Sequence, residues 1–240
     1  MIHRVMSRQE RRGFTLIELL VVITIIAILA TISVPAVMRA IQMANRIKSS
    51  AHLTNIGQAA WNYASTANRF PPGRSGSNTF YVTLKDEMDL GFIQPGQAVS
   101  EFLDPARGSA TTVSGPYAHY GYDSAPTSLF GSPKGVPFGN ISSARYTLML
   151  GIMGMNPQDY LTSGEDWATG NFGISASSGV QKDDESSGGG GFGSPYSTGA
   201  PFLYADRTVR LIRYEITPTT FQALWQVQKP AGAVNTDELD

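Results

Sequence analysis

The feature that most constrains this 240-residue chain is one apolar run near its N-terminus, residues 14–34 (FTLIELLVVITIIAILATISV). These 21 residues include a single charged side chain, that of Glu18. A helix that crosses a bilayer needs about 20 predominantly apolar residues, whereas the apolar region of a secretory signal peptide spans about 7–15. No small-residue cleavage site follows the run. We therefore predict a retained membrane-spanning helix.

Charge is distributed unevenly around this run, although the formal net charge is only −1. Residues 1–48 carry seven lysine or arginine residues and two acidic residues, whereas residues 49–240 carry eleven and seventeen. Basic residues mark the cytoplasmic end of a membrane helix, which predicts a cytoplasmic N-terminus and an exported, acidic remainder. The whole chain has no field that attracts nucleic acid, and we expect no nucleic-acid partner.

A plain signal anchor satisfies the hydropathy alone, but it has no use for Glu18. A carboxylate within the bilayer costs about 2.5–3.5 kcal/mol, and somewhat less near a helix end. A cation about 4 Å away contributes about 4 kcal/mol at an effective dielectric constant of 20 and offsets this cost. No lysine or arginine of the run can provide the cation. A positive group of another chain, or a newly made α-amine, can.

The helical pattern continues beyond Pro35, where a proline predicts a kink or an end. Two apolar stripes follow it, rotated relative to each other. The first comprises Val37, Ala40, Ile41, Ala44, Ile47 and Ala51, and the second Ile56, Ala59, Ala60, Tyr63 and Ala67. A helix from Phe14 to about Ala67 is roughly 80 Å long. Its outer half must therefore pack on its own domain, on sister helices, or on both.

Residues 11–18 (RRGFTLIE) resemble the class III signal of type IV pilins and type II secretion pseudopilins. That pattern combines a basic leader, Gly, Phe, Glu as the fifth mature residue, an apolar run and a proline at the kink. The resemblance implies cleavage between Gly13 and Phe14 by a prepilin peptidase, which also methylates the new amine. It further implies that Glu18 pairs with the Phe14 amine of a neighbouring subunit in a filament.

Four later segments resemble a large bacterial family of pilin-like proteins whose C-terminal domain carries a His-(nine residues)-Asp-Gly motif. They are residues 52–73 (HLTNIGQAAWNYASTANRFPPG), 102–105 (FLDP), 141–151 (ISSARYTLMLG) and 201–226 (PFLYADRTVRLIRYEITPTTFQALWQ). Asp206 is the motif residue that this chain retains. Asp104 stands where the family has Cys, Tyr196 where it has His, and Arg207 where it has Gly. The chain therefore resembles a divergent member.

The last of these segments predicts a β-hairpin followed by a short helix. Residues 201–205 and 208–215 form two apolar runs around a turn at Asp206-Arg207, although Arg is a poor residue for positive φ. We expect Asp206 to accept hydrogen bonds from the amides of this turn. Thr217 is the predicted N-cap of a helix that begins with Pro218.

We predict an α+β, pilin-like fold, in which a long N-terminal helix packs against an antiparallel sheet head with a short C-terminal helix. The predicted parts are a leader (1–13), a transmembrane and assembly helix (14–35), its amphipathic continuation (36–67), an extracytoplasmic head (68–228) and a tail (229–240). The absence of cysteine excludes a disulfide scaffold and a cysteine nucleophile.

Catalytic or metal chemistry finds little support. Outside the leader there are two histidines, His52 and His119, and the chain has no G-x-S-x-G, Walker A or H-E-x-x-H motif. We expect no enzymatic activity and no cofactor. The acidic trio 183–185 (DDE) is a candidate calcium ligand set, with a solvated loop as the alternative.

The predicted function is that of a structural subunit of a type IV pilus-like or type II secretion pseudopilus filament. The implied partners are prepilin peptidase, sister subunits, an inner-membrane assembly platform and membrane lipid. Before assembly the subunit would cross the inner membrane once, with its head periplasmic or at the cell surface. One alternative is a head that is an adhesin or carbohydrate-binding module, with Trp61, Trp167 and Trp225 in a sugar-stacking face. Another is a membrane-anchored enzyme.

Overall fold

The computed structural model describes residues 14–90, 93–94, 96–113, 115–162, 165–183, 191–230 and 232–239. The chain forms two compact units, Met1–Ile41 and Gln42–Asp240. Gly13 and the rest of the predicted leader lie outside the described residues, as do Asp184 and Glu185 of the acidic trio.

The helix α1, Leu16–Ala67, is 52 residues long and contains Pro35 within it. It begins after an N-terminal capping arrangement at Thr15 and is followed by Asn68, whose left-handed φ of 58° is typical of the residue after a helix. Every described residue of the first unit is exposed. The apolar window is long and hydrophobic enough to cross a membrane, and none of it is buried.

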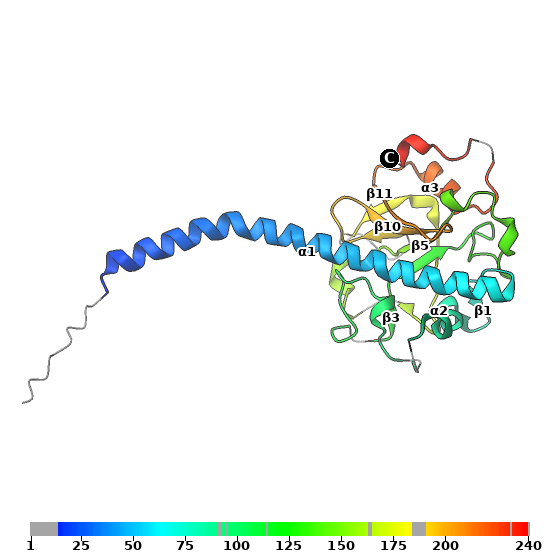
Figure 1. The fold of residues 1–240 in the computed structure, drawn as a ribbon, viewed down its shortest axis with the longest axis horizontal. Coiled ribbons are helices and arrows are strands. Elements are labelled where there is room, and N and C mark those ends of the chain that lie inside the picture. The colour runs from blue at the N-terminus through cyan, green and yellow to red at the C-terminus, as the bar shows by residue number, and fades with distance from the viewer. Residues whose placement is uncertain are drawn as a thin grey trace, which may run out of the picture. The chain divides into compact units, whose positions relative to one another are not determined.

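Within the second unit, α1 buries one face against the head (Figure 1). The buried residues recur at helical spacing: Ser49, His52, Leu53, Ile56, Gly57, Ala59, Ala60 and Ala64. At Gly57 a Cβ would lie 2.8 Å from both methyl groups of Leu203, so the absence of a side chain permits close approach to the sheet. The second predicted stripe thus contributes to the packing face. Val37, Ile41 and Ile47 of the first stripe remain more than half exposed.

The head contains a five-stranded sheet in the order β11-β10-β5-β4-β7. These strands are β11 (Val209–Ile212), β10 (Ala200–Tyr204), β5 (Leu148–Ile152), β4 (Tyr120–Asp123) and β7 (Gly173–Ile174). Pairing is antiparallel from β11 to β4, whereas β7 joins β4 in parallel. The α+β fold is as predicted, but the parallel edge strand adds to the purely antiparallel sheet that we expected.

Over its described residues, the head also has three short strand pairs and two short helices. The pairs are β1 (Arg74–Ser75) with β2 (Asn78–Thr79), β3 (Tyr117–Ala118) with β6 (Glu165–Asp166), and β8 (Val180–Lys182) with β9 (Phe192–Ser194). The helices are α2 (Phe80–Leu84) and α3 (Pro218–Trp225), and 3-10 turns cover Lys85–Met88, Ser100–Phe102, Phe138–Asn140, Ala144–Tyr146, Pro157–Asp159, Ala176–Ser178 and Thr236–Glu238.

The helix α3 begins as predicted, with Pro218 in its first turn and Thr217 as N-cap, accepting a hydrogen bond from the Thr220 amide (3.3 Å). The C-terminal turn adds a second cap, because the Glu238 carboxylate accepts the Thr217 amide at 3.0 Å. Rings of α3 pack on the sheet and on β9, with the centroids of Trp225 and Phe192 4.6 Å apart.

The predicted hairpin is formed by β10 and β11, but its turn differs by one residue from the expectation. The Arg207 amide donates to Tyr204 O (3.0 Å) and the Tyr204 amide to Thr208 O (2.9 Å). The loop therefore has three residues, with Arg207 in the left-handed region at φ 70°. A three-residue loop needs a left-handed residue at this place to match the twist of the strands, and a two-residue turn at Asp206-Arg207 is not formed.

Candidate functional site

The N-terminus of α1 holds Glu18 in a capping box. Glu18 Oε2 accepts the Thr15 amide (2.9 Å) and the Thr15 hydroxyl (2.8 Å), while the Glu18 amide donates to Thr15 Oγ1 (3.3 Å). These bonds satisfy backbone donors that have no partner in the first turn of a helix. Within the described residues, no bond reaches Glu18 Oε1, so the carboxylate keeps one oxygen for a further cation.

The other residues of the predicted N-terminal site are placed only in part. The Phe14 side chain is 76% exposed, and Pro35 lies within the continuous helix. Gly13 is outside the described residues. Processing at Gly13 and Phe14, the kink at Pro35 and the pairing of Glu18 with a neighbour stay predictions.

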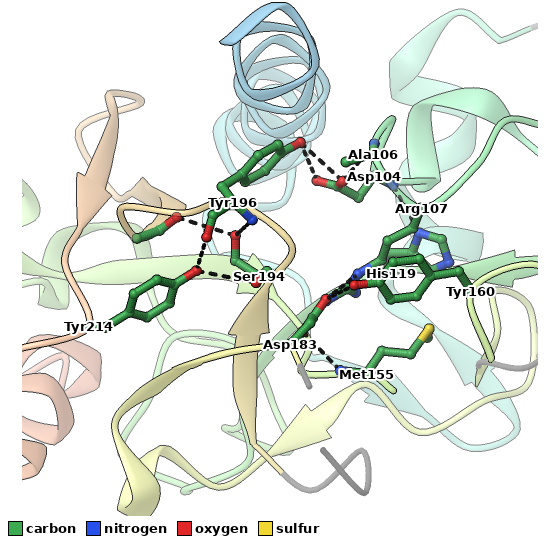
Figure 2. Close-up of polar contacts among 11 residues, drawn as sticks. Asp104, Ala106, Arg107, His119, Met155, Tyr160, Asp183, Ser194, Tyr196 and Tyr214 are labelled. Atoms are coloured by element: carbon green, nitrogen blue, oxygen red, sulfur yellow. Dashed lines mark hydrogen bonds and ion pairs between the residues drawn. The ribbon is translucent and has the colours of Figure 1, made fainter. Parts of the chain in front are cut away.

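The head contains a buried polar cluster that the sequence analysis did not predict (Figure 2). Its centre is the ion pair of Arg107 and Asp183, whose side chains are wholly buried. Asp183 Oδ2 accepts from Arg107 Nε (2.9 Å), Arg107 Nη2 (2.6 Å) and Tyr160 Oη (2.8 Å), and Oδ1 accepts the Met155 amide (3.2 Å). In this structure the Asp183 carboxylate is therefore paired with a buried guanidinium.

Asp104 and Tyr196 form the second part of the cluster. Tyr196 Oη lies 3.0 Å from each carboxylate oxygen of Asp104, whose Oδ1 also accepts the Ala106 amide (3.0 Å). Burial raises the pKa of Asp104 above its ordinary value, against the opposing charge of Arg107. Two positions at which the chain departs from the pattern that it resembles are therefore in direct contact.

The two histidines of the second unit, His52 on α1 and His119 in the head, are buried in opposite tautomers. His52 Nδ1 lies 3.0 Å from the Leu103 carbonyl oxygen, which only accepts, so this nitrogen carries the proton. His119 Nδ1 accepts the Asp104 amide (3.0 Å), so its proton is on Nε2. Burial lowers the pKa of His52, and burial with the charge of Arg107 lowers the pKa of His119 well below its ordinary value. Both are neutral structural residues.

This cluster has the composition of a structural network. In the part of the chain that the structure describes, no group of three or more His, Asp or Glu side chains is arranged to hold a metal ion. Asp184 and Glu185 lie outside that part, and calcium binding by the trio stays a prediction. Among the residues that the structure describes, no hydrogen-bond partner reaches the buried Arg107 Nη1 or His119 Nε2.

Asp206 stabilises the hairpin, as expected for a turn carboxylate. Its Oδ1 accepts the Thr208 amide (3.0 Å), and its Oδ2 forms an ion pair with Arg210 Nη2 (2.6 Å). The guanidinium carbon of Arg207 lies 5.3 Å from the centre of the Trp61 ring. Trp167 and Trp225 are buried to 99% or more, so the predicted sugar-stacking face with all three tryptophans is not formed.

Two features escaped the sequence analysis for different reasons. Thr15 and Glu18 match the local T-x-x-E capping pattern, which was readable from the sequence. Arg107 and Asp183 are 76 residues apart, and no local pattern links residues at such a separation.

The N-terminal segment carries a recognised signal. Residues 8–34 match the family described as the prokaryotic N-terminal methylation motif, which confirms the resemblance based on Gly13, Phe14 and Glu18. The match covers the basic leader residues from Arg8 onward and the apolar half of the helix.

A longer similarity is to one curated protein. Over 70 residues it is 36% identical to the type II secretion system core protein G of Pectobacterium carotovorum subsp. carotovorum. This region is 29% of the present chain and 45% of the relative, so the chain spans less than half the length of the curated protein that it matches. No solved structure matches the chain at a significant level.

The buried ion pair predicts a large difference between two arginine substitutions. Arg107→Met leaves the Asp183 carboxylate buried without a cation, and we expect the free energy of unfolding to fall by about 3–5 kcal/mol. Arg210→Met breaks the partly exposed pair with Asp206 and should cost about 1 kcal/mol or less. Chemical denaturation of the full-length protein in detergent measures both. Equal losses would contradict the assignment, and Arg107→Met combined with Asp183→Asn should recover part of the larger loss.

The lowered pKa of buried His119 predicts that the free energy of unfolding decreases on acidification. Below the ordinary histidine pKa of about 6.5 the unfolded chain binds protons that buried, neutral His119 does not bind, so unfolding becomes easier as pH falls. In His119→Asn the amide oxygen can still accept the Asp104 amide, but the titration is removed. Between pH 7 and pH 5 we expect the wild type to lose up to about 2 kcal/mol more unfolding free energy than this variant. Carboxylates such as Asp104 titrate in both proteins, so a difference between the two pH profiles reports on His119 alone. Identical pH profiles would refute the prediction.

Proposed function

We propose that the chain is a structural subunit of a type II secretion pseudopilus or a type IV pilus-like filament. The observation that carries this proposal is the methylation motif of residues 8–34 on a helix whose apolar half is entirely exposed. Such a surface needs lipid or other apolar helices as its surroundings, because water does not solvate it favourably. The role is structural, and the proposal assigns no catalytic residue.

Glu18 supplies the charge that makes assembly selective. In the single chain its Oε2 is held by Thr15, which fixes the carboxylate at the N-terminal end of the helix. Cleavage after Gly13 would create an α-amine on Phe14, and methylation would keep its positive charge. The amine of one subunit and the Glu18 carboxylate of its neighbour then neutralise each other in an apolar environment, which sets the axial register of the helices.

The proposed assembly surface is the exposed apolar half of α1 together with Glu18. The exposed residues of the first stripe extend this surface beyond the membrane span. Val37, Ile41 and Ile47 are 55%, 54% and 64% exposed. In a filament these side chains would pack against sister helices, and before assembly the apolar half of α1 would hold the subunit in the inner membrane, with its basic leader in the cytoplasm.

The partial similarity to core protein G supports a secretion pseudopilus as the machine. On this proposal the partners are prepilin peptidase, sister subunits, the inner-membrane assembly platform and membrane lipid. The head would lie in the periplasm, or at the cell surface if the filament extends that far.

Processing is tested by mass spectrometry of the protein purified from membranes of a host that has a prepilin peptidase. We expect the mature chain to begin at Phe14 with a methylated amine, because the motif places the cleavage site after Gly13. Gly13→Lys serves as the control and should remain uncleaved. An N-terminus that still includes the leader in the wild-type protein would refute the processing step.

Assembly is tested by Glu18→Ala, compared with Thr15→Val. Glu18→Ala should leave the protein in the membrane but abolish its incorporation into filaments, because the neighbouring amine loses its counterion. Thr15→Val removes the capping bonds of the Thr15 hydroxyl and keeps the carboxylate, so filaments should still form. Immunoblots of sheared filament and membrane fractions measure both. Wild-type filament amounts in Glu18→Ala would exclude pairing, and equal loss in both variants would assign Glu18 to helix capping alone.

A further inference from the structure

A pocket of about 450 Å³ lies beside the hairpin of the head. None of its lining residues belongs to the proposed assembly surface on α1. Its lining includes Arg145, Tyr146, Tyr204, Arg210, Leu211 and Leu239. Its volume falls within the range of about 300–1,000 Å³ that is typical of small-molecule sites. The described lining contains two guanidinium groups and no carboxylate.

The two arginines of this pocket are held differently. Arg210 stacks 4.6 Å from the centre of the Tyr204 ring, and its Nη atoms bond to Asp206 Oδ2 (2.6 Å) and to the Arg145 carbonyl (3.1 Å). The charge of Arg210 is therefore already balanced. Its bond to the main chain at residue 145 fixes the position of the second arginine relative to the hairpin.

Arg145 is the unbalanced cation of the pocket. Its guanidinium carbon lies 5.7 Å from the centre of the Tyr146 ring, and within the described residues its side chain has no hydrogen bond or ion pair. A guanidinium over an aromatic ring still has N–H groups that can bind both oxygens of a carboxylate. Stacking on the ring also reduces the side-chain freedom that binding would otherwise remove.

Size and charge define the ligand class. An inorganic oxyanion would fill only a small part of 450 Å³, whereas the side chains of Tyr146, Leu211 and Leu239 offer apolar contact to a carbon skeleton. Asp237 and Glu238 lie between the lining residues Thr236 and Leu239, and their negative charges reduce the positive field of the pocket. These features favour a ligand with one negative charge.

We propose that this pocket binds a small carboxylate-bearing ligand of sugar-acid size. The carboxylate lies on the edge of the Arg145 guanidinium, and the ring or carbon skeleton packs against Tyr146 and Leu211. This site is independent of the proposed filament function, because it uses none of the residues of the assembly surface.

The test is isothermal titration calorimetry of the full-length protein in detergent with glucuronate, glucose and inorganic sulfate as probes. We expect glucuronate to bind and glucose not to bind. Arg145→Gln should weaken glucuronate binding about tenfold or more, because a charge-assisted bidentate contact is lost. Arg74→Gln, which removes a positive charge outside the pocket lining, should bind like the wild type. Arg145→Lys keeps the charge but loses the planar fork, and should give an intermediate affinity.

Several outcomes would overturn the proposal. These are the absence of glucuronate binding to the wild type, equal binding of glucose, or unchanged binding in Arg145→Gln. Sulfate binding as tightly as glucuronate would refute the sugar-acid ligand, since the ring would then contribute nothing. Arg145 is exposed and makes no side-chain bond within the described head, so matched thermal unfolding of wild type and variant verifies that a loss of binding is local.

Discussion

The apolar N-terminal half of α1 is exposed along its whole described length, and the proposed role of the protein depends on this exposure. The buried residues of α1 begin only at Ser49, while the large apolar side chains before that point are 45–78% exposed. Soluble monomers rarely leave contiguous apolar patches larger than a few hundred Å² uncovered. The chain therefore requires an apolar environment outside itself. On the proposed function, lipid provides it before assembly and sister helices provide it in the filament.

Polar contacts determine the rotation and position of the buried part of α1 on the sheet. Apolar burial is non-directional, so on its own it permits the helix to rotate or slide on the sheet. Ser49 Oγ lies 3.2 Å from Tyr120 Oη, His52 bonds to the Leu103 carbonyl, and Trp61 Nε1 donates to the Ala205 carbonyl at 3.0 Å. At 100° per residue, His52 and Trp61 project to opposite sides of α1, so these contacts hold the helix from both flanks of its packed face. They select one rotation of the helix, which in turn determines which stripe remains outside.

Local patterns carried the predictions that proved correct. The apolar run and the T-P start of α3 depend on residues within a few positions of each other, and so do the two strands of the hairpin. The hairpin turn was misplaced by one residue, because the sequence analysis did not anticipate that a three-residue loop would hold Arg207 at positive φ. The parallel strand β7 and the Arg107–Asp183 pair depend on segments that are distant in sequence. Only the complete chain topology brings those segments together, so periodicity and spacing contain no information about them.

The conformation of Arg207 has a consequence for how firmly the hairpin is attached to the helix. A left-handed backbone costs a residue with a side chain about 1–2 kcal/mol, and a partly exposed stacking contact such as that with Trp61 contributes about 0.5–1 kcal/mol. The loop is thus locally strained, and the strain is only partly offset by a contact with another element. Glycine would relax the loop but remove the arginine side chain that reaches α1. An unstrained backbone in the turn and a side-chain contact with the helix are therefore opposing requirements at residue 207. Arg207 provides the contact at the cost of the strain.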